Sequence, residues 1–206
     1  MVAVAKTPCI TPQEYLERER TAQCKSEYVA GAIYAMAGAS EAHILISTNL
    51  TGDLWSQFKG RPCKVYNNDM KVLVNTTGLY TYPDVVALCG EAQFHDRQKD
   101  VLLNPSMIFE VLSPSTEAYD RGEKFNHYQH IAALTDYVLV TQDRIRLERY
   151  QRQTDGSWRY TCHEDSEEVI HFSALNCELR LADVYDKVEF PVRMEGNAQP
   201  EDSPPA

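Results

Sequence analysis

The chain has 206 residues, a formal net charge of −10 and 43% hydrophobic residues. That length suits one domain with its own apolar core, and the hydrophobic content excludes a chain that is disordered throughout. The acidic balance argues against a protein that coats nucleic acid through a general basic excess. No apolar run approaches the roughly 20 residues of a membrane span, and no apolar leader precedes the first helix, so we expect neither a span nor a secretory signal.

The six cysteines are neither paired as CxxC nor set at zinc-finger spacing. We therefore expect reduced thiols and a cytoplasmic location, with a zinc site or a disulfide as the less favoured alternatives. We predict one domain over residues 11–192, between a loose start at 1–10 and a disordered tail at 193–206. The tail is rich in proline and acidic residues and almost free of apolar ones.

The first predicted helix covers residues 11–20, where Thr11 and Glu14 have the spacing of a capping box. Two short strands then form a hairpin around Gly31. The clearest helix covers residues 40–60, with Ser40 as its N-cap. Along it, apolar residues recur every four positions, as in a stripe that faces a core: Ile46, Leu50, Leu54 and Phe58.

The rest of the chain is dominated by short apolar runs that predict strands, with one further helix among them at residues 120–131. Asp120 and Glu123 have capping-box spacing at the start of that helix. The order of helix, strands, helix and strands predicts an α/β domain with a central mixed sheet flanked by helices. The predicted strands are 63–67, 70–75, 84–89, 106–113, 136–140, 144–152, 157–162 and 167–172.

Two of these strands each contain a carboxylate, Asp84 and Glu110, among apolar residues on both faces. Alternation places Asp84 on the face of Val86, and Glu110 on the face of Leu112. A carboxylate in a covered strand is costly unless it is paired, hydrogen-bonded or bound to a cation. One alternative is structural: Asp84 caps a loop and Glu110 pairs with a buried basic residue.

Helical spacing puts Lys124 on the same face as Tyr128 and Ile131, which directs the lysine inward. Lys124 either extends to the surface or is the partner of the inward carboxylates. Glu27, in the first strand of the hairpin, is a further candidate, with a solvated strand glutamate as the alternative.

At these residues the sequence resembles the Uma2 family of restriction-endonuclease-like proteins, formerly a domain of unknown function, within the PD-(D/E)xK nuclease superfamily. The resemblance covers roughly residues 11–190, in order. One matching stretch is "LLNPSMIFEVLSPSTEAYDRGEKFNHYQHI", and its most specific part is "EVLSPSTEAYDRGEKF". The other matching stretches are "EYVAGAIYAMAGASEAH", "GLYTYPDVVALCGE" and "DYVLVTQD".

The resemblance implies a restriction-endonuclease-like core and a site for Mg²⁺, which Mn²⁺ can replace. Asp84 and Glu110 would match the acidic residues of the superfamily motif and bind the metal, with the carbonyl of Val111 as a further ligand. Glu27 would match the glutamate that such folds contribute earlier in the chain. All three acidic residues would be catalytic.

The superfamily lysine normally lies two residues after the second acid, where this sequence has Leu112. Lys124 is the natural replacement, because its helical spacing already directs it inward. His43 and Tyr128 also fall in matching stretches and are placed at the periphery of the site. For His43, the alternative is a core histidine that hydrogen-bonds a backbone carbonyl.

The predicted function is a divalent-metal-dependent endonuclease that hydrolyses phosphodiester bonds in nucleic acid, with DNA as the expected substrate and a homodimer as a plausible assembly. Three alternatives stand beside it: a catalytically inactive relative that binds nucleic acid or regulates, an unrelated α/β enzyme, and a structural ion-pair module. No aromatic stacking platform is evident. Two basic clusters could follow a phosphate backbone, or could be solvated strand faces: Arg61, Lys64 and Lys71, and Arg121, Arg144, Arg146, Arg149 and Arg152.

Overall fold

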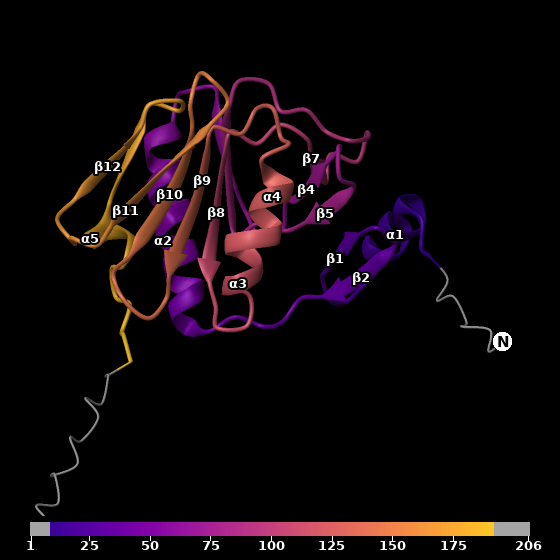
Figure 1. Cartoon of the computed structure of the whole chain (residues 1–206), viewed down its shortest axis with the longest axis horizontal. Helices are drawn as coiled ribbons and strands as arrows, with labels where there is room; N and C mark the ends of the chain where they lie inside the picture. The colour runs from indigo at the N-terminus through magenta and orange to yellow at the C-terminus, as the bar shows by residue number, and fades with distance from the viewer. Residues whose placement is uncertain (1–8, 192–206) are drawn as a thin grey trace, which may run out of the picture.

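The computed structural model describes residues 9–191, so the predictions for the first residues of the chain and for the tail lie outside the described residues. The fold is mixed α/β, as predicted: two main sheets and a small third one are accompanied by few helices (Figure 1). Within residues 9–191, no helix has both the length and the apolar character that crossing a membrane requires.

The larger sheet has six strands, and the parallel pair β8–β9 lies at its centre, with antiparallel pairs on either side. Every residue of β8 and β9 is buried, as expected for strands covered on both faces. The strand order is β11 (Trp158–His163), β10 (Leu147–Arg152), β9 (Asp136–Thr141), β8 (Met107–Leu112), β6 (Val85–Cys89) and β3 (Cys63–Asn67).

The smaller sheet has five strands, in the order β2 (Ala32–Ala35), β1 (Ser26–Val29), β5 (Leu79–Thr81), β4 (Lys71–Val74) and β7 (Val101–Leu102). The predicted β1–β2 hairpin is confirmed. Its two turn residues, Ala30 and Gly31, have φ angles of 50° and 87°, the positive values of the two-residue turn that matches strand twist. A third sheet pairs β12 (Val169–Phe172) with β13 (Cys177–Arg180).

Helix α2 (Glu41–Phe58) covers one face of the larger sheet (Figure 1). Its predicted stripe is confirmed, since all four apolar residues are buried and pack against strand residues such as Val85 and Phe109. Ser40 caps the helix by accepting a hydrogen bond from the backbone N–H of His43. The predicted capping box of α1 (Pro12–Glu19) is also present, between Thr11 and Glu14. A last short helix, α5, covers Leu181–Val184.

The opposite face of the larger sheet is covered by the smaller sheet and by a helical segment of three parts: α3 (Glu117–Tyr119), the π-helical turn η1 (Asp120–Lys124) and α4 (Phe125–Tyr128). Tyr128 packs there against β8 and β6 residues. The prediction that Asp120 caps this helix is wrong. The helix begins earlier, and the Asp120 side chain is buried inside the fold, where it has a cationic partner.

The strand predicted at 144–152 begins only at Leu147, because the chain turns back between Thr141 and Arg146. The expectation of six reduced thiols is wrong for Cys63 and Cys89, which form a disulfide. Spacing could not reveal it, since the two cysteines meet only because β3 and β6 pair in a register that places them opposite each other. The cytoplasmic location stays a prediction.

Leu50→Ala tests whether the α2 stripe supports the sheet that bears the site. Removal of this fully buried side chain leaves a cavity against the larger sheet, so we expect a loss of about 2–5 kcal/mol in the free energy of unfolding. Urea denaturation followed by circular dichroism measures it. The matched control is Ile44→Ala, on the exposed side of the same helix, which should change stability by less than about 0.5 kcal/mol.

Candidate active site

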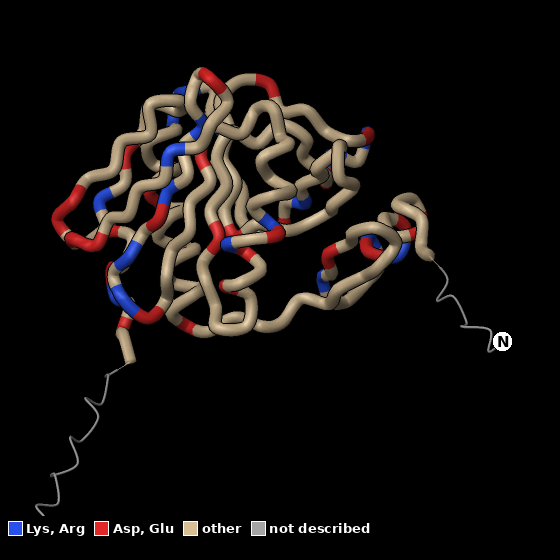
Figure 2. Tube along the Cα trace, in the orientation of Figure 1, with Lys and Arg blue, Asp and Glu red and all other residues tan. Residues whose placement is uncertain are grey.

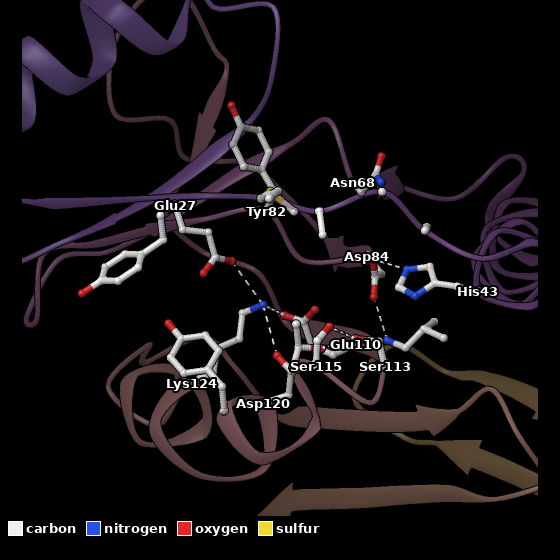
Figure 3. Close-up of a pocket in the computed structure, with 18 of the residues that line it drawn as sticks. Glu27, His43, Asn68, Tyr82, Asp84, Glu110, Ser113, Ser115, Asp120 and Lys124 are labelled. Atoms are coloured by element: carbon white, nitrogen blue, oxygen red, sulfur yellow. Dashed lines mark hydrogen bonds and ion pairs between the residues drawn. The ribbon is translucent and has the colours of Figure 1, made fainter.

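A cavity of about 580 Å³ opens where the two main sheets and the α3–η1–α4 segment meet. Each of the three elements contributes charged side chains to its wall. Glu27 comes from β1, Glu110 from β8, and Lys124 and Asp120 from η1, while Asp84 immediately precedes β6. Figure 3 shows these side chains converging on the Lys124 amine, with Asp84 beside them.

Strand pairing brings the two motif carboxylates together. Val85 pairs with Phe109 in the antiparallel β6–β8 ladder, so the register places Asp84 opposite Glu110. The backbone N–H of Val111 donates to Asp84 Oδ2 at 2.7 Å, and His43 Nε2 lies 2.9 Å from Asp84 Oδ1. Both oxygens of Asp84 are therefore held in position by groups from two different elements.

The ammonium group of Lys124 lies among three carboxylates. Its Nζ is 3.0 Å from Glu110 Oε1, 3.3 Å from Glu27 Oε1 and 3.4 Å from Asp120 Oδ1. Lys124 is only 5% exposed and Glu110 only 3%, so these contacts lie in a medium that screens charge poorly. Lys124 is thus a partner of inward carboxylates and does not extend to the surface.

Neighbouring side chains orient the same carboxylates. The Tyr128 hydroxyl donates to Glu110 Oε1 at 2.8 Å, and the Thr81 hydroxyl donates to Glu27 Oε1. Tyr128 lies beneath the site, fully buried in the apolar cluster that also contains Leu112. That packing explains the leucine: the position two residues after Glu110 faces the core, and the lysine reaches Glu110 from the helix.

Burial and mutual repulsion set the protonation of this cluster. Burial raises the pKa of Glu110 well above its usual value, although the Lys124 charge opposes the shift. Burial likewise raises the pKa of Asp120. Burial alone would lower the pKa of Lys124, but Glu110, Tyr128, Glu27 and Asp120 raise it well above the usual value. The cluster has more acids than cations, so it favours an added proton or metal ion.

The structure brings every predicted site residue to this cavity or directly beneath it. His43 contacts the Asp84 carboxylate, so the alternative of a core histidine bonded to a carbonyl is wrong. For Val111, the contact in the site is made by its N–H, and the metal-ligand role of its carbonyl stays a prediction. The sequence reasoning missed Asp120 as a site residue. Its spacing of four from Lys124 was the available signal.

The two predicted basic clusters do not form open cationic tracks. Most members bind carboxylates or carbonyls within the fold, and acidic and basic positions are interleaved along the chain (Figure 2). Arg121 and Arg146 both bind Glu148. The other partners are Asp136 for Arg149, Asp143 for Arg144, Asp100 and the Tyr82 hydroxyl for Lys71, and backbone carbonyls for Arg61 and Arg152, while Lys64 remains exposed.

Comparison with known proteins places these residues in a family. Residues 12–184 match the model of the Uma2 family, described as "Putative restriction endonuclease". Two proteins of Synechocystis sp., named uncharacterized proteins slr1290 and sll1609, are 38% and 36% identical to the chain. The first match covers 80% of this chain and 86% of the relative, and the second covers 84% and 98%.

A crystal structure from Anabaena variabilis, titled as that of a "putative nuclease belonging to DUF820", has a similar fold. Its TM-score is 0.71 at 16% sequence identity, and the match covers 85% of this chain and 97% of that one. At this identity the similarity concerns the fold alone. It supports the restriction-endonuclease-like arrangement of sheets and helices.

Lys124→Met tests the electrostatic account of the site. At a pH of about 7 the variant leaves several buried carboxylates without their cation, so we expect the free energy of unfolding to fall by about 3 kcal/mol or more. Without Lys124 the folded-state pKa values of Glu110 and Asp120 rise further. A carboxyl group whose pKa is raised in the folded state destabilises that state at pH values above its usual pKa, which is 4.5 for Glu110 and 3.8 for Asp120. This destabilisation is relieved as the pH falls and the groups take up protons.

The difference between wild type and Lys124→Met in urea unfolding should therefore shrink between a pH of about 7 and about 5. Lys187→Met removes an exposed lysine and serves as the control, with little effect at either pH. A Lys124→Met penalty that is independent of pH would contradict the charge account and leave only lost packing.

Proposed function

The chain belongs to the Uma2 family, and from this premise we propose that it is a divalent-metal-dependent nuclease that hydrolyses phosphodiester bonds, with DNA as its substrate. The observation that carries the proposal is the buried Lys124 amine, in contact with Glu110 and Glu27, beside Asp84 at an open cavity. A structural ion-pair module has no need of a cavity at this point, whereas a nuclease must admit a phosphodiester group.

The donor set fits a Mg²⁺-type ion. No group of three or more histidine, cysteine, aspartate or glutamate side chains within residues 9–191 has the geometry of a dedicated cage. Mg²⁺ does not require one, because it is usually held by one or two carboxylates and keeps several waters. Within the described part of the chain, the hydrogen bond and the ion pair of the Glu110 carboxylate both involve Oε1, which leaves Oε2 available, and Asp84 is directly opposite.

Asp84 and Glu110 would hold the metal ion, with the Val111 carbonyl as a third candidate ligand. When bound, such an ion stabilises negative charge on phosphate oxygens and lowers the pKa of water. The protein's own groups do the rest. The His43 ring and the Val111 N–H fix the direction of the Asp84 carboxylate, and the Tyr128 hydroxyl fixes that of Glu110.

Lys124 supplies a fixed positive charge at the same point. It lies in a poorly screened environment, where a preorganised charge stabilises an anionic transition state more than it would in water. Its ammonium group donates hydrogen bonds, so it can orient an attacking water or neutralise a phosphate oxygen. Glu27, on its far side, holds the amine in place and is available to accept a proton or position a second water.

A second candidate function is nucleic-acid binding or regulation without cleavage. It is favoured by the way the three carboxylates engage Lys124, since a lysine committed to them is less free to serve a reaction. The two candidates share the same surface and differ in whether a phosphodiester bond is cut.

Purified protein with Mg²⁺ or Mn²⁺ should cut DNA, and chelation by EDTA should stop the reaction reversibly. Asp84→Asn and Glu110→Gln keep the shape of each side chain but remove its charge. Each should lower the cleavage rate by at least about 100-fold, because both the metal affinity and the charge of the site fall. Release of a quenched fluorophore from a labelled oligonucleotide measures the rate.

Asp53→Asn is the matched control, because Asp53 is a partly buried carboxylate on α2 that lies at a separate surface hollow. It should retain the wild-type rate. Cleavage that persists in both Asp84→Asn and Glu110→Gln contradicts the assigned site. DNA binding without cleavage in the wild type, at any divalent ion tested, favours the second candidate.

A further inference from the structure

The charges around the cavity restrict which nucleic acids can enter it. Among the described residues that line the cavity, Lys124 is the one lysine or arginine, against five acids: Glu27, Asp84, Glu110, Asp120 and Glu123. Most basic residues of the two predicted clusters bind carboxylates or backbone carbonyls of the protein and are not free to bind phosphates. A duplex carries one charge per about 1.7 Å of its axis, and proteins that coat it neutralise many phosphates. The residues that line this cavity include too few cations to neutralise many phosphates.

Part of the cavity wall is aromatic and apolar. Tyr34 of β2 is 58% exposed and lines the cavity together with the adjoining segment 35–39, which is mostly alanine and glycine. Tyr119 lines it from the helical side. Strand β2 is exposed along its whole length, so the Tyr34 ring is not committed to the core. The sequence indicated no stacking platform because a tyrosine in an edge strand gives no sign of which cavity it faces.

Strand register places this ring next to the charged cluster. Tyr34 is directly opposite Glu27 in the antiparallel β1–β2 pair, so the two side chains share a face with Cβ atoms about 5 Å apart. The Glu27 carboxylate in turn lies 3.3 Å from Lys124 Nζ. The Glu27 side chain is therefore all that separates the exposed Tyr34 ring from Lys124, which would receive a phosphate.

We propose that this site takes an unpaired nucleotide, in a single strand or extruded from a duplex, and that Tyr34 stacks on its base. The inference rests on the proposed nuclease function and names its substrate class. Stacking on an aromatic side chain needs no sequence and little positive charge, because every base has a π-face. A volume of about 580 Å³ is that of a small-ligand pocket, which suits one nucleotide better than a continuous duplex.

The test compares three labelled DNA substrates of the same sequence with full-length protein and Mg²⁺: a single strand, a perfect duplex and a duplex with an internal unpaired loop. We expect kcat/KM to be highest for the single strand and the looped duplex. KM for the single strand should rise less than about tenfold between roughly 50 and 200 mM salt, since only one or two phosphates are neutralised.

Tyr34→Ala should raise KM for the single strand roughly tenfold, and Tyr34→Phe, which keeps the ring, should restore it. Tyr160→Ala is the matched control, because Tyr160 is a tyrosine of similar exposure, 46%, on β11 and outside the cavity lining. It should leave KM unchanged. A preference for the perfect duplex, a silent Tyr34→Ala, or no rescue by Tyr34→Phe would overturn the inference and leave the nuclease function standing.

Two further outcomes also count against the inference. If the wild type cuts none of the three substrates with Mg²⁺ or Mn²⁺, the proposed function fails and the inference fails with it. If Tyr34→Ala converts a dimer to a monomer in sedimentation velocity, the exposed β2 edge is a self-association surface, and a change in KM then has that cause.

Discussion

The arrangement of the site depends on a single buried ammonium group. Lys124 is in contact with carboxylates from three separate elements: Glu27 of the smaller sheet, Glu110 of the larger sheet and Asp120 of the intervening helical turn. Each of these acids, if buried alone, would impose a desolvation cost of several kcal/mol. The cation therefore constrains how closely the two sheets and the helix can approach, and the cavity lies where they meet.

A buried ion-pair network adds little stability compared with apolar packing, so its cost must be offset elsewhere in the fold. The offset is visible on both faces of the larger sheet. Helix α2 packs one face, while Tyr128, Leu112 and the smaller sheet pack the other. The apolar layers hold the strands firmly enough that Asp84 and Glu110 stay opposite each other. The leucine and valine side chains therefore supply the stability, and the excess of acids supplies the capacity to bind a cation.

The scarcity of unpaired basic side chains also restricts what the cavity can admit. Arg121 and Arg146 are bound to Glu148, and Arg152 is bound to backbone carbonyls, so these cations serve the fold. Lys124 is the one lysine or arginine among the described residues that line the cavity, so under the proposed function recognition of a nucleic acid would fall to a metal ion, Lys124 and the exposed ring of Tyr34. A net charge of −10 is compatible with the proposed nuclease function, because the contact with the polyanion would be small.

The sequence by itself determined the features that follow from local periodicity. Spacing of four predicted the buried face of α2 and the inward direction of Lys124. Apolar residues on both faces of its run predicted that Glu110 lies in a covered strand, whereas Asp84, predicted to lie in another such strand, immediately precedes β6. Tertiary structure alone decided the partnerships. The register of β3 with β6 joined Cys63 to Cys89, and packing of the helix turned Asp120, which reads locally as a cap, into a partner of Lys124. Backbone periodicity acts over a few residues, whereas the pairing of distant charges depends on which surfaces pack together.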